Sequence, residues 1–206
     1  IYRSKIFPEL GKGLPVKLSF LDRVQTHTFA FGKFEEGLLN WQRTYTLNRE
    51  DYLETIDTTI YQNRDDNEAI EKLNRLRELI TWNYSYSIIK AVEQAKLRLS
   101  DHPTTHIDVP ELNLFVKIRR IEFEQIIGDT LRLISQSIDV VLHKAGITRG
   151  GIHHVVTTGG SSLIPAVQQM LNTRFAQRVT SHNEFTSIAA GLAISNYYGY
   201  QYYQDQ

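Results

Sequence analysis

The fold is decided by one segment, Val155-Val156-Thr157-Thr158-Gly159-Gly160-Ser161-Ser162-Leu163-Ile164-Pro165. Its β-branched run predicts a buried strand, its glycines a tight turn, and its proline the first turn of a new helix. Ser161 and Ser162 are expected to cap that helix. Glycines permit positive φ, and the amides at such a turn suit phosphate. A plain strand–turn–helix connection has the same pattern, so the motif alone leaves both interpretations open.

The composition is that of an ordinary globular chain. Its 206 residues suffice for one sizeable core or two small ones. Lysines plus arginines number 23, as do aspartates plus glutamates, so no net charge recruits nucleic acid or a membrane surface. Absent cysteines exclude disulfides and thiolate chemistry and fit a reducing compartment, and no apolar run reaches the roughly 18 residues of a membrane span. The chain starts at Ile1, and we expect it to be part of a longer protein.

The first two thirds of the chain predict helices and one clear hairpin. Alternation around Val16–Phe20 and Phe29–Phe31 predicts short strands, and Asn48 is expected to cap a helix that reaches Tyr61. Residues 65–100 contain no proline or glycine and predict one long helix, unless it breaks near Asn83-Tyr84-Ser85. A hairpin is expected over residues 105–118.

The last third predicts a helix-covered sheet. A long amphipathic helix is expected over residues 121–145, with Gly146 as its C′ residue, followed by strand 153–158, helix 164–175, strand 178–180 and helix 184–198. This α-β-α-β-α order predicts a mostly parallel sheet. Two strands are too few for such a sheet, so others must come from the N-terminal region, another chain or residues not present. An exposed sheet edge could pair two copies as a homodimer.

Histidine pairs and serines are poor candidates for metal binding or catalysis. His102 and His106 are separated by Pro103, and His153 and His154 point to opposite faces of a strand, so we expect no metal site. Ser161 and Ser162 lack a Gly-x-Ser-x-Gly elbow.

Four motifs, in unbroken order over roughly residues 86–195, resemble the second lobe of the ATPase domain in heat-shock protein 70 (DnaK-type) chaperones. They are Glu93-Gln94-Ala95-Lys96-Leu97-Arg98-Leu99-Ser100, Arg120-Ile121-Glu122-Phe123-Glu124, Thr158-Gly159-Gly160-Ser161-Ser162-Leu163-Ile164-Pro165 and Ile188-Ala189-Ala190-Gly191-Leu192-Ala193. The resemblance implies an α/β fold, a partial actin-like ATPase domain with a ribonuclease H-like sheet remnant. Residues 1–118 would form the helix-rich small subdomain with its hairpin, and 119–206 the large subdomain without its first strands.

The resemblance also implies a site for ATP or ADP. Glu93, Lys96 and Ser100, which share one helix face at this spacing, would hold the adenosine. Gly159, Gly160 and Ser161 would approach the phosphates and ribose. Leu97 and Leu163 stand where the family usually places arginines against the adenine, so a cation–π contribution of about 0.5–2 kcal/mol would be lost. The usual Asn-Pro-Asp-Glu before the last helix reads Asn183-Glu184-Phe185-Thr186.

Several parts of the family's ATPase domain have no counterpart in this sequence. No Asp-x-Gly-Gly-Gly-Thr phosphate loop occurs, so residues elsewhere would hold Mg²⁺ and the attacking water, and we expect no catalysis by this segment alone. The parent would be a cytoplasmic chaperone in which nucleotide-dependent lobe closure controls client proteins, co-chaperones and nucleotide-exchange factors. Two alternatives remain: an actin-like or cell-shape filament ATPase of the same superfamily, and a degenerate lobe that acts as a protein-interaction module without nucleotide.

Overall fold

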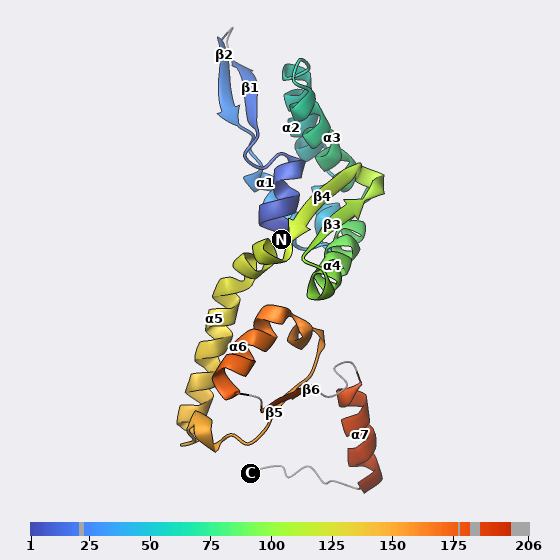
Figure 1. Ribbon diagram of the computed structural model, residues 1–206. Coiled ribbons are helices and arrows are strands. Elements are labelled where there is room, and N and C mark those ends of the chain that lie inside the picture. The colour runs from blue at the N-terminus through green and yellow to red at the C-terminus, as the bar shows by residue number, and fades with distance from the viewer. Residues whose placement is uncertain (21–22, 177, 182–185, 199–206) are drawn as a thin grey trace. The chain divides into compact units, whose positions relative to one another are not determined.

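The computed structural model describes residues 1–20, 23–176, 178–181 and 186–198 as a mixed α/β protein with small sheets (Figure 1). The chain divides into two compact units, Ile1–Phe123 and Glu124–Gln206, and each is described by itself. That residues 1–118 and 119–206 correspond to two subdomains of one ATPase lobe stays a prediction, as does the actin-like topology.

The first unit combines two antiparallel hairpins with helices. Its elements are β1 (Pro15–Phe20), β2 (Arg23–Thr28), α1 (Gly32–Leu39), α2 (Glu50–Gln62), α3 (Asn67–Trp82), α4 (Ser85–Asp101), β3 (Thr104–Val109) and β4 (Leu114–Arg119). β1 pairs with β2 and β3 with β4, each in antiparallel register. Helix α5 (Arg120–Lys144) begins in the last residues of this unit. The hairpin predicted over residues 105–118 is confirmed.

A continuous apolar core holds the first unit together. Its fully buried side chains come from the N-terminal turns, α1, α2, α3, α4 and the second hairpin, among them Phe7, Phe34, Ile56, Leu73, Leu76, Ile88, Leu99 and Ile107. The aromatic rings of Phe7 and Phe31 lie 5.1 Å apart, and those of Phe29 and Phe34 lie 5.8 Å apart. The strand expected at Phe29–Phe31 is wrong, because this segment is a loop whose two phenylalanines are buried in the core.

The helical stretch over residues 65–100 breaks at the position that the sequence offered as the alternative. Asn83 takes a left-handed conformation with φ of 53°, and this conformation ends α3 at Trp82. The expectation that Asn48 caps the preceding helix is wrong. Arg49 precedes α2 and no side chain caps it, although Glu50 and Asp51 supply the acidic first turn.

The first hairpin is fastened to α2 by a single buried side chain. The Asn63 amide, 4% exposed, accepts a hydrogen bond from the Lys17 N–H at 2.7 Å and donates to the Lys17 carbonyl at 3.0 Å. It therefore pairs with β1 as a neighbouring strand residue would. Its amide nitrogen also donates to the Thr59 carbonyl at 2.8 Å, which fixes the side chain to α2.

The second unit contains most of α5, then β5 (Val155–Thr157), α6 (Pro165–Phe175), β6 (Val179–Ser181) and α7 (Ser187–Tyr198). β5 and β6 are parallel, with Val155 opposite Val179, so the parallel pairing predicted here is confirmed. β5 is shorter than the strand predicted over residues 153–158, and β6 begins and ends one residue later than the strand predicted over residues 178–180. Gly146 follows α5 with φ of 66°, as predicted for its C′ residue.

Polar contacts rather than a core connect α5 and α6. Arg174 of α6, whose side chain is 12% exposed, contacts Ser135 and Asp139 of α5, and Arg149 donates to the same Asp139 carboxylate at 2.8 Å. Among the described residues of this unit, Phe175 alone is a buried apolar side chain. The unit is therefore held mainly by ionic contacts and three-residue strands.

Candidate functional site

The Gly-Gly turn follows β5 with the backbone geometry that requires glycine. Gly159 has φ of 82° and ψ of 149°, a region that residues with a side chain rarely adopt. A side chain built at Gly159 would meet no described atom within 4 Å, so conformation rather than lack of space demands the glycine. Gly160 and Ser161 are exposed beside it. The turn thus offers open, uncovered backbone after a strand.

Of two expectations about the helix after the turn, one is confirmed and one is wrong. Pro165 is in the first turn of α6, as predicted, and a 3₁₀ turn over Gly160–Leu163 lies between the glycines and this helix. Ile164 precedes α6 without a side-chain cap, and the Ser162 hydroxyl instead donates to the Gly159 carbonyl at 2.7 Å. The serines therefore stabilise the turn and do not cap the helix.

The polar residues predicted on one helix face do share it. Glu93, Lys96 and Ser100 occur at i, i+3 and i+7 on α4, while Val92, Ala95 and Leu99 of the same helix are buried in the core. Glu93 and Lys96 are exposed and Ser100 is half-buried. This face combines a carboxylate, an ammonium and a hydroxyl, groups that can hydrogen-bond ribose hydroxyls and base edges.

The C-terminal end of α4 is held by the second motif. The Arg120 guanidinium donates to the Leu99 carbonyl at 2.7 Å and to the Ser100 carbonyl at 3.1 Å, satisfying two acceptors that a helix end leaves open. Phe123 of the same motif is buried. Arg120 therefore fixes the backbone at Ser100, a role that no local sequence pattern indicates.

Glu122, the third residue of the segment Arg120–Glu124, fixes the start of α5. Its carboxylate accepts the Arg119 N–H at 2.8 Å and pairs with the Lys5 ammonium at 2.9 Å. Hydrogen bonds from Lys5 and Arg119 lower the pKa of Glu122 to about 2. The segment Arg120–Glu124 thus performs a structural task, joining α4, α5 and the N-terminal helical turn Tyr2–Ile6.

Tyr2 is a residue near the predicted site that sequence analysis missed. Burial raises the pKa of its phenol, and the Glu93 carboxylate raises it further, so the two side chains lie close enough to interact. They are 91 positions apart, and no periodicity or spacing relates them. Tyr2 is consequently a neutral hydrogen-bonding group beside the Glu93 end of the α4 face.

The two leucines in place of the family's arginines have different surroundings. Leu97 is 52% exposed on α4, whereas Leu163 is half-buried at the end of the 3₁₀ turn. Glu93, Lys96, Leu97 and Ser100 are brought together by α4, and Gly159, Gly160, Ser161 and Leu163 by the turn after β5. That the two groups bind one nucleotide stays a prediction.

The described part of the chain contains neither a metal-binding cluster nor a helix that could span a membrane. No cluster of three or more histidine, aspartate or glutamate side chains lies close enough there to hold a metal ion. No described helix is long and apolar enough to cross a membrane. Residues 182–185, which include most of the segment that replaces Asn-Pro-Asp-Glu, lie outside the described residues.

Comparison with known proteins decides the family. The sequence model of the family described as "Hsp70 protein" matches residues 64–197, more than half of the chain. The chain belongs to the Hsp70 family. Its motifs on α4, at the start of α5 and at the Gly-Gly turn all lie inside the matched region, so the resemblance drawn from the sequence is confirmed. The sequence left open two nucleotide-binding families, the DnaK-type chaperones and the actin-like filament ATPases, and the match names the first of them.

Curated Hsp70 relatives agree with this assignment. The chain is 30% identical over 118 residues to the chaperone protein DnaK of Deinococcus radiodurans, covering 52% of the chain and 19% of that protein. It is 31% identical over 118 residues to DnaK of Thermus thermophilus, with the same coverage. It is 32% identical over 110 residues to a heat shock 70 kDa protein of Neurospora crassa, covering 50% and 17%. The chain thus spans about a fifth of the length of these relatives.

Proposed function

We propose that this Hsp70 chain supplies the adenosine side of an ATP or ADP site. The observation that carries the proposal is the polar face of α4, where Glu93, Lys96 and Ser100 align while the adjacent face of the helix is buried in a core. Arg120 hydrogen-bonds the last carbonyls of that helix, so the backbone that carries the polar groups is fixed. The family match supports nucleotide as the ligand.

The proposed roles follow the chemistry of each group. The Glu93 carboxylate accepts hydrogen bonds from ribose hydroxyls, and the Lys96 ammonium and Ser100 hydroxyl donate to acceptor atoms of the nucleoside. Gly159, Gly160 and Ser161 let the phosphates approach the backbone, because Gly159 has open space beside it. Leu97 and Leu163 flank the base by apolar contact. Residues outside this chain hold Mg²⁺, which supplies charge neutralisation at the phosphates.

In the parent protein we propose a cytoplasmic chaperone. Nucleotide binding and hydrolysis would close and open two lobes, and this movement would control the binding of client proteins and co-chaperones, including nucleotide-exchange factors. The first unit of the present chain would act in this cycle as a well-packed nucleotide-sensing element. The support is the family membership together with the well-packed first unit.

One observation favours a second function. Leu97, in the middle of the α4 face, exposes 52% of its surface, where an arginine would have stacked on the base. An exposed leucine flanked by charged side chains also suits a protein interface. The second candidate is therefore a lobe that has lost nucleotide and binds another protein through this face.

Isothermal titration of ATP and ADP into the full-length protein tests the proposal. Lys96→Met removes a charged hydrogen bond, and Gly160→Glu fills the space through which the phosphates would approach the backbone. Each variant should weaken nucleotide binding by about tenfold or more. Lys90→Met on the same helix is the matched control and should leave binding unchanged. Wild-type affinity in both site variants would overturn the proposed site. No binding of either nucleotide to the wild-type protein would favour the second candidate.

A further inference from the structure

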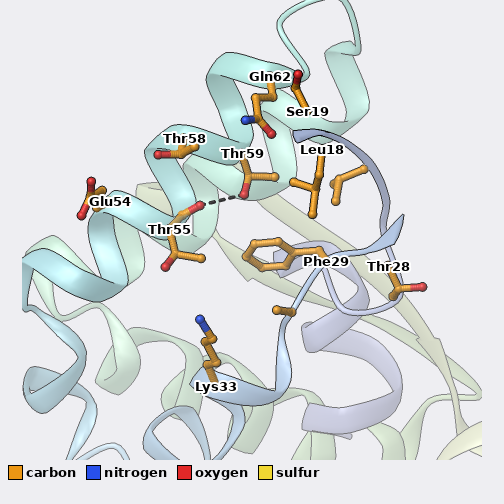
Figure 2. Close-up of a pocket in the computed structure, with 12 residues that line it drawn as sticks. Leu18, Ser19, Thr28, Phe29, Lys33, Glu54, Thr55, Thr58, Thr59 and Gln62 are labelled. Atoms are coloured by element: carbon orange, nitrogen blue, oxygen red, sulfur yellow. Dashed lines mark hydrogen bonds between the residues drawn. The ribbon is translucent and has the colours of Figure 1, made fainter. Parts of the chain in front are cut away.

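The first unit contains a cavity that lies outside the proposed nucleotide site. It has a volume of about 400 Å³ and is enclosed by the first hairpin, the loop into α1 and one face of α2 (Figure 2). All its lining residues lie between Val16 and Gln62, and so precede residue 64, where the Hsp70 match begins. Its size is within the range of about 300–1,000 Å³ usual for ligand pockets.

The interior of the cavity is mostly apolar, although threonines line one wall and the buried Gln62 Oε1 accepts no hydrogen bond from the described residues. Val16 and Phe29 are buried and form the floor with Leu18. The Thr59 hydroxyl donates to the Thr55 carbonyl at 2.7 Å, and the Thr55 hydroxyl to the Asp51 carbonyl at 2.8 Å. Because both hydroxyls bond back to α2, these threonines present mainly methyl groups to the cavity.

The cavity is preformed. Asn63 fastens β1 to the C-terminal end of α2 through both polar groups of the Lys17 backbone, which fixes the distance between the hairpin and the helix. The Phe29 ring stacks on Phe34 of the core. A ligand therefore enters a fixed space and loses little affinity to reorganisation of the protein.

Two opposite charges stand at the mouth on different elements. Lys33 of α1 and Glu54 of α2 are both exposed, and neither has an ion-pair partner among the described residues. Figure 2 shows the Lys33 ammonium directed toward the cavity from below, with Glu54 on the neighbouring helix. Of the four acidic residues of α2, Asp51 pairs with Arg49 and Asp57 with Arg77, so Glu54 is the carboxylate of this helix that lines the mouth.

We propose that this cavity docks a short segment of a partner protein, whose large apolar side chain enters the methyl-lined interior. An acidic residue of the segment meets Lys33, and a basic residue on the other side of the anchor meets Glu54. A chain with charges of opposite sign separated by an apolar centre satisfies both sides of the mouth. A small anion pairs with Lys33 alone and leaves Glu54 without a partner. The charge pattern therefore selects a peptide as the occupant.

A random peptide library, displayed on phage and selected on the full chain, provides the probe. The counter-selection uses Thr58→Trp, because Thr58 is an exposed residue of α2 at the mouth and its replacement by an indole obstructs entry without touching the core. Thr26→Trp is the matched control, since Thr26 pairs with Lys17 and lies on the opposite face of the hairpin from Val16 and Leu18.

Peptides enriched on the wild-type chain should share one large apolar residue between an acidic and a basic residue. Their affinity should fall about tenfold or more in Thr58→Trp, and on replacement of the anchor by alanine, since the anchor supplies most of the buried area. Thr26→Trp should bind as wild type does. Equal binding to Thr58→Trp, or enrichment without an apolar anchor, would overturn the proposal.

Exchanging the charges of Lys33 and Glu54 tests the direction in which the peptide lies across the mouth of the cavity. Lys33→Glu and Glu54→Lys should each weaken a selected peptide by about two- to fivefold, as expected for exposed ion pairs. The double variant, with Lys33→Glu and Glu54→Lys together, should regain affinity for a peptide whose own acidic and basic residues are exchanged. Lys17→Gln should leave peptide affinity unchanged. Insensitivity to all these charges would overturn the assignment of a charged segment. A dimer in sedimentation that Thr58→Trp dissociates would overturn the partner in favour of a second copy of the chain.

Discussion

The two units differ in how they are held together. The first unit buries a continuous set of apolar side chains from several helices and both hairpins. The second unit also has helices with many apolar side chains, but among its described residues Phe175 is the single apolar side chain that is buried. Both contain the elements that the sequence predicts. This difference indicates that hydrophobic periodicity specifies a helix or strand, whereas the stability of that element requires another part of the protein to cover its apolar face.

Helix α5 shows this most clearly. Its apolar stripe predicts a core-facing helix, yet Leu133 is 60% exposed, Val141 62% and Ile134 40%. A surface hollow of about 430 Å³ lies along these residues. Parallel sheets are normally covered on both faces, but β5 and β6 are only three residues each and cannot cover a 25-residue helix. The Arg174–Asp139 contact is left as the main tie between α5 and α6.

The largest expected difference is in hydrogen exchange. Amides of α3 and α4 should be protected to the level of global unfolding, of order 5–15 kcal/mol, because these helices form the core. Amides of α6 and α7 should exchange with a protection close to zero. Exchange followed by mass spectrometry on the full chain checks this. Equal protection in the two units would show that the second unit has a core of its own under those conditions.

A matched pair of leucine truncations gives the next largest effect. Leu76→Ala removes a fully buried side chain of α3 and should lower the free energy of unfolding by about 2–5 kcal/mol. Leu133→Ala on α5 should change it by less than about 0.5 kcal/mol. Urea unfolding followed by tryptophan fluorescence suits the first measurement, since Trp41 and Trp82 both lie in the first unit. Circular dichroism reports the second.

Two helical glycines should respond to alanine with opposite sign. A Cβ at Gly37 would lie 2.8 Å from the buried Leu47 side chain, so overpacking of about 1–3 kcal/mol exceeds the helix-propensity gain. A Cβ at Gly128 of α5 meets nothing within 4 Å, so Gly128→Ala should stabilise the helix by about 0.5–1 kcal/mol. Thermal unfolding monitored by circular dichroism checks both. A stabilised Gly37→Ala would mean that Leu47 has room to move.

What the sequence could predict follows from the range of each interaction. Helix spacing placed Glu93, Lys96 and Ser100 on one face correctly, because that relation spans two turns of one helix. The proximity of Tyr2 to Glu93 and the hydrogen bonds from Arg120 to the end of α4 depend on packing between distant segments, which no local pattern encodes. The prediction that the serines cap α6 was wrong for a local reason, since both serines lie in a 3₁₀ turn and Ile164 directly precedes the helix.

The smallest expected effect compares two carboxylates at acid pH. Hydrogen bonds hold the pKa of Glu122 near 2, below its usual 4.5, so the charged form stabilises the first unit above pH 4.5 and this stabilisation is lost as the pH falls toward 2. Glu122→Gln should therefore lower the urea midpoint at pH 6, and the difference from wild type should shrink progressively below pH 4.5. The pKa of Asp139 is lowered by Arg174 and Arg149 in the same way, but in the second unit. Asp139→Asn should consequently leave the tryptophan-monitored midpoint unchanged at every pH. A midpoint that moves with Asp139 would show that the two units unfold together, and the contrast between them would then be one of packing without a difference in stability.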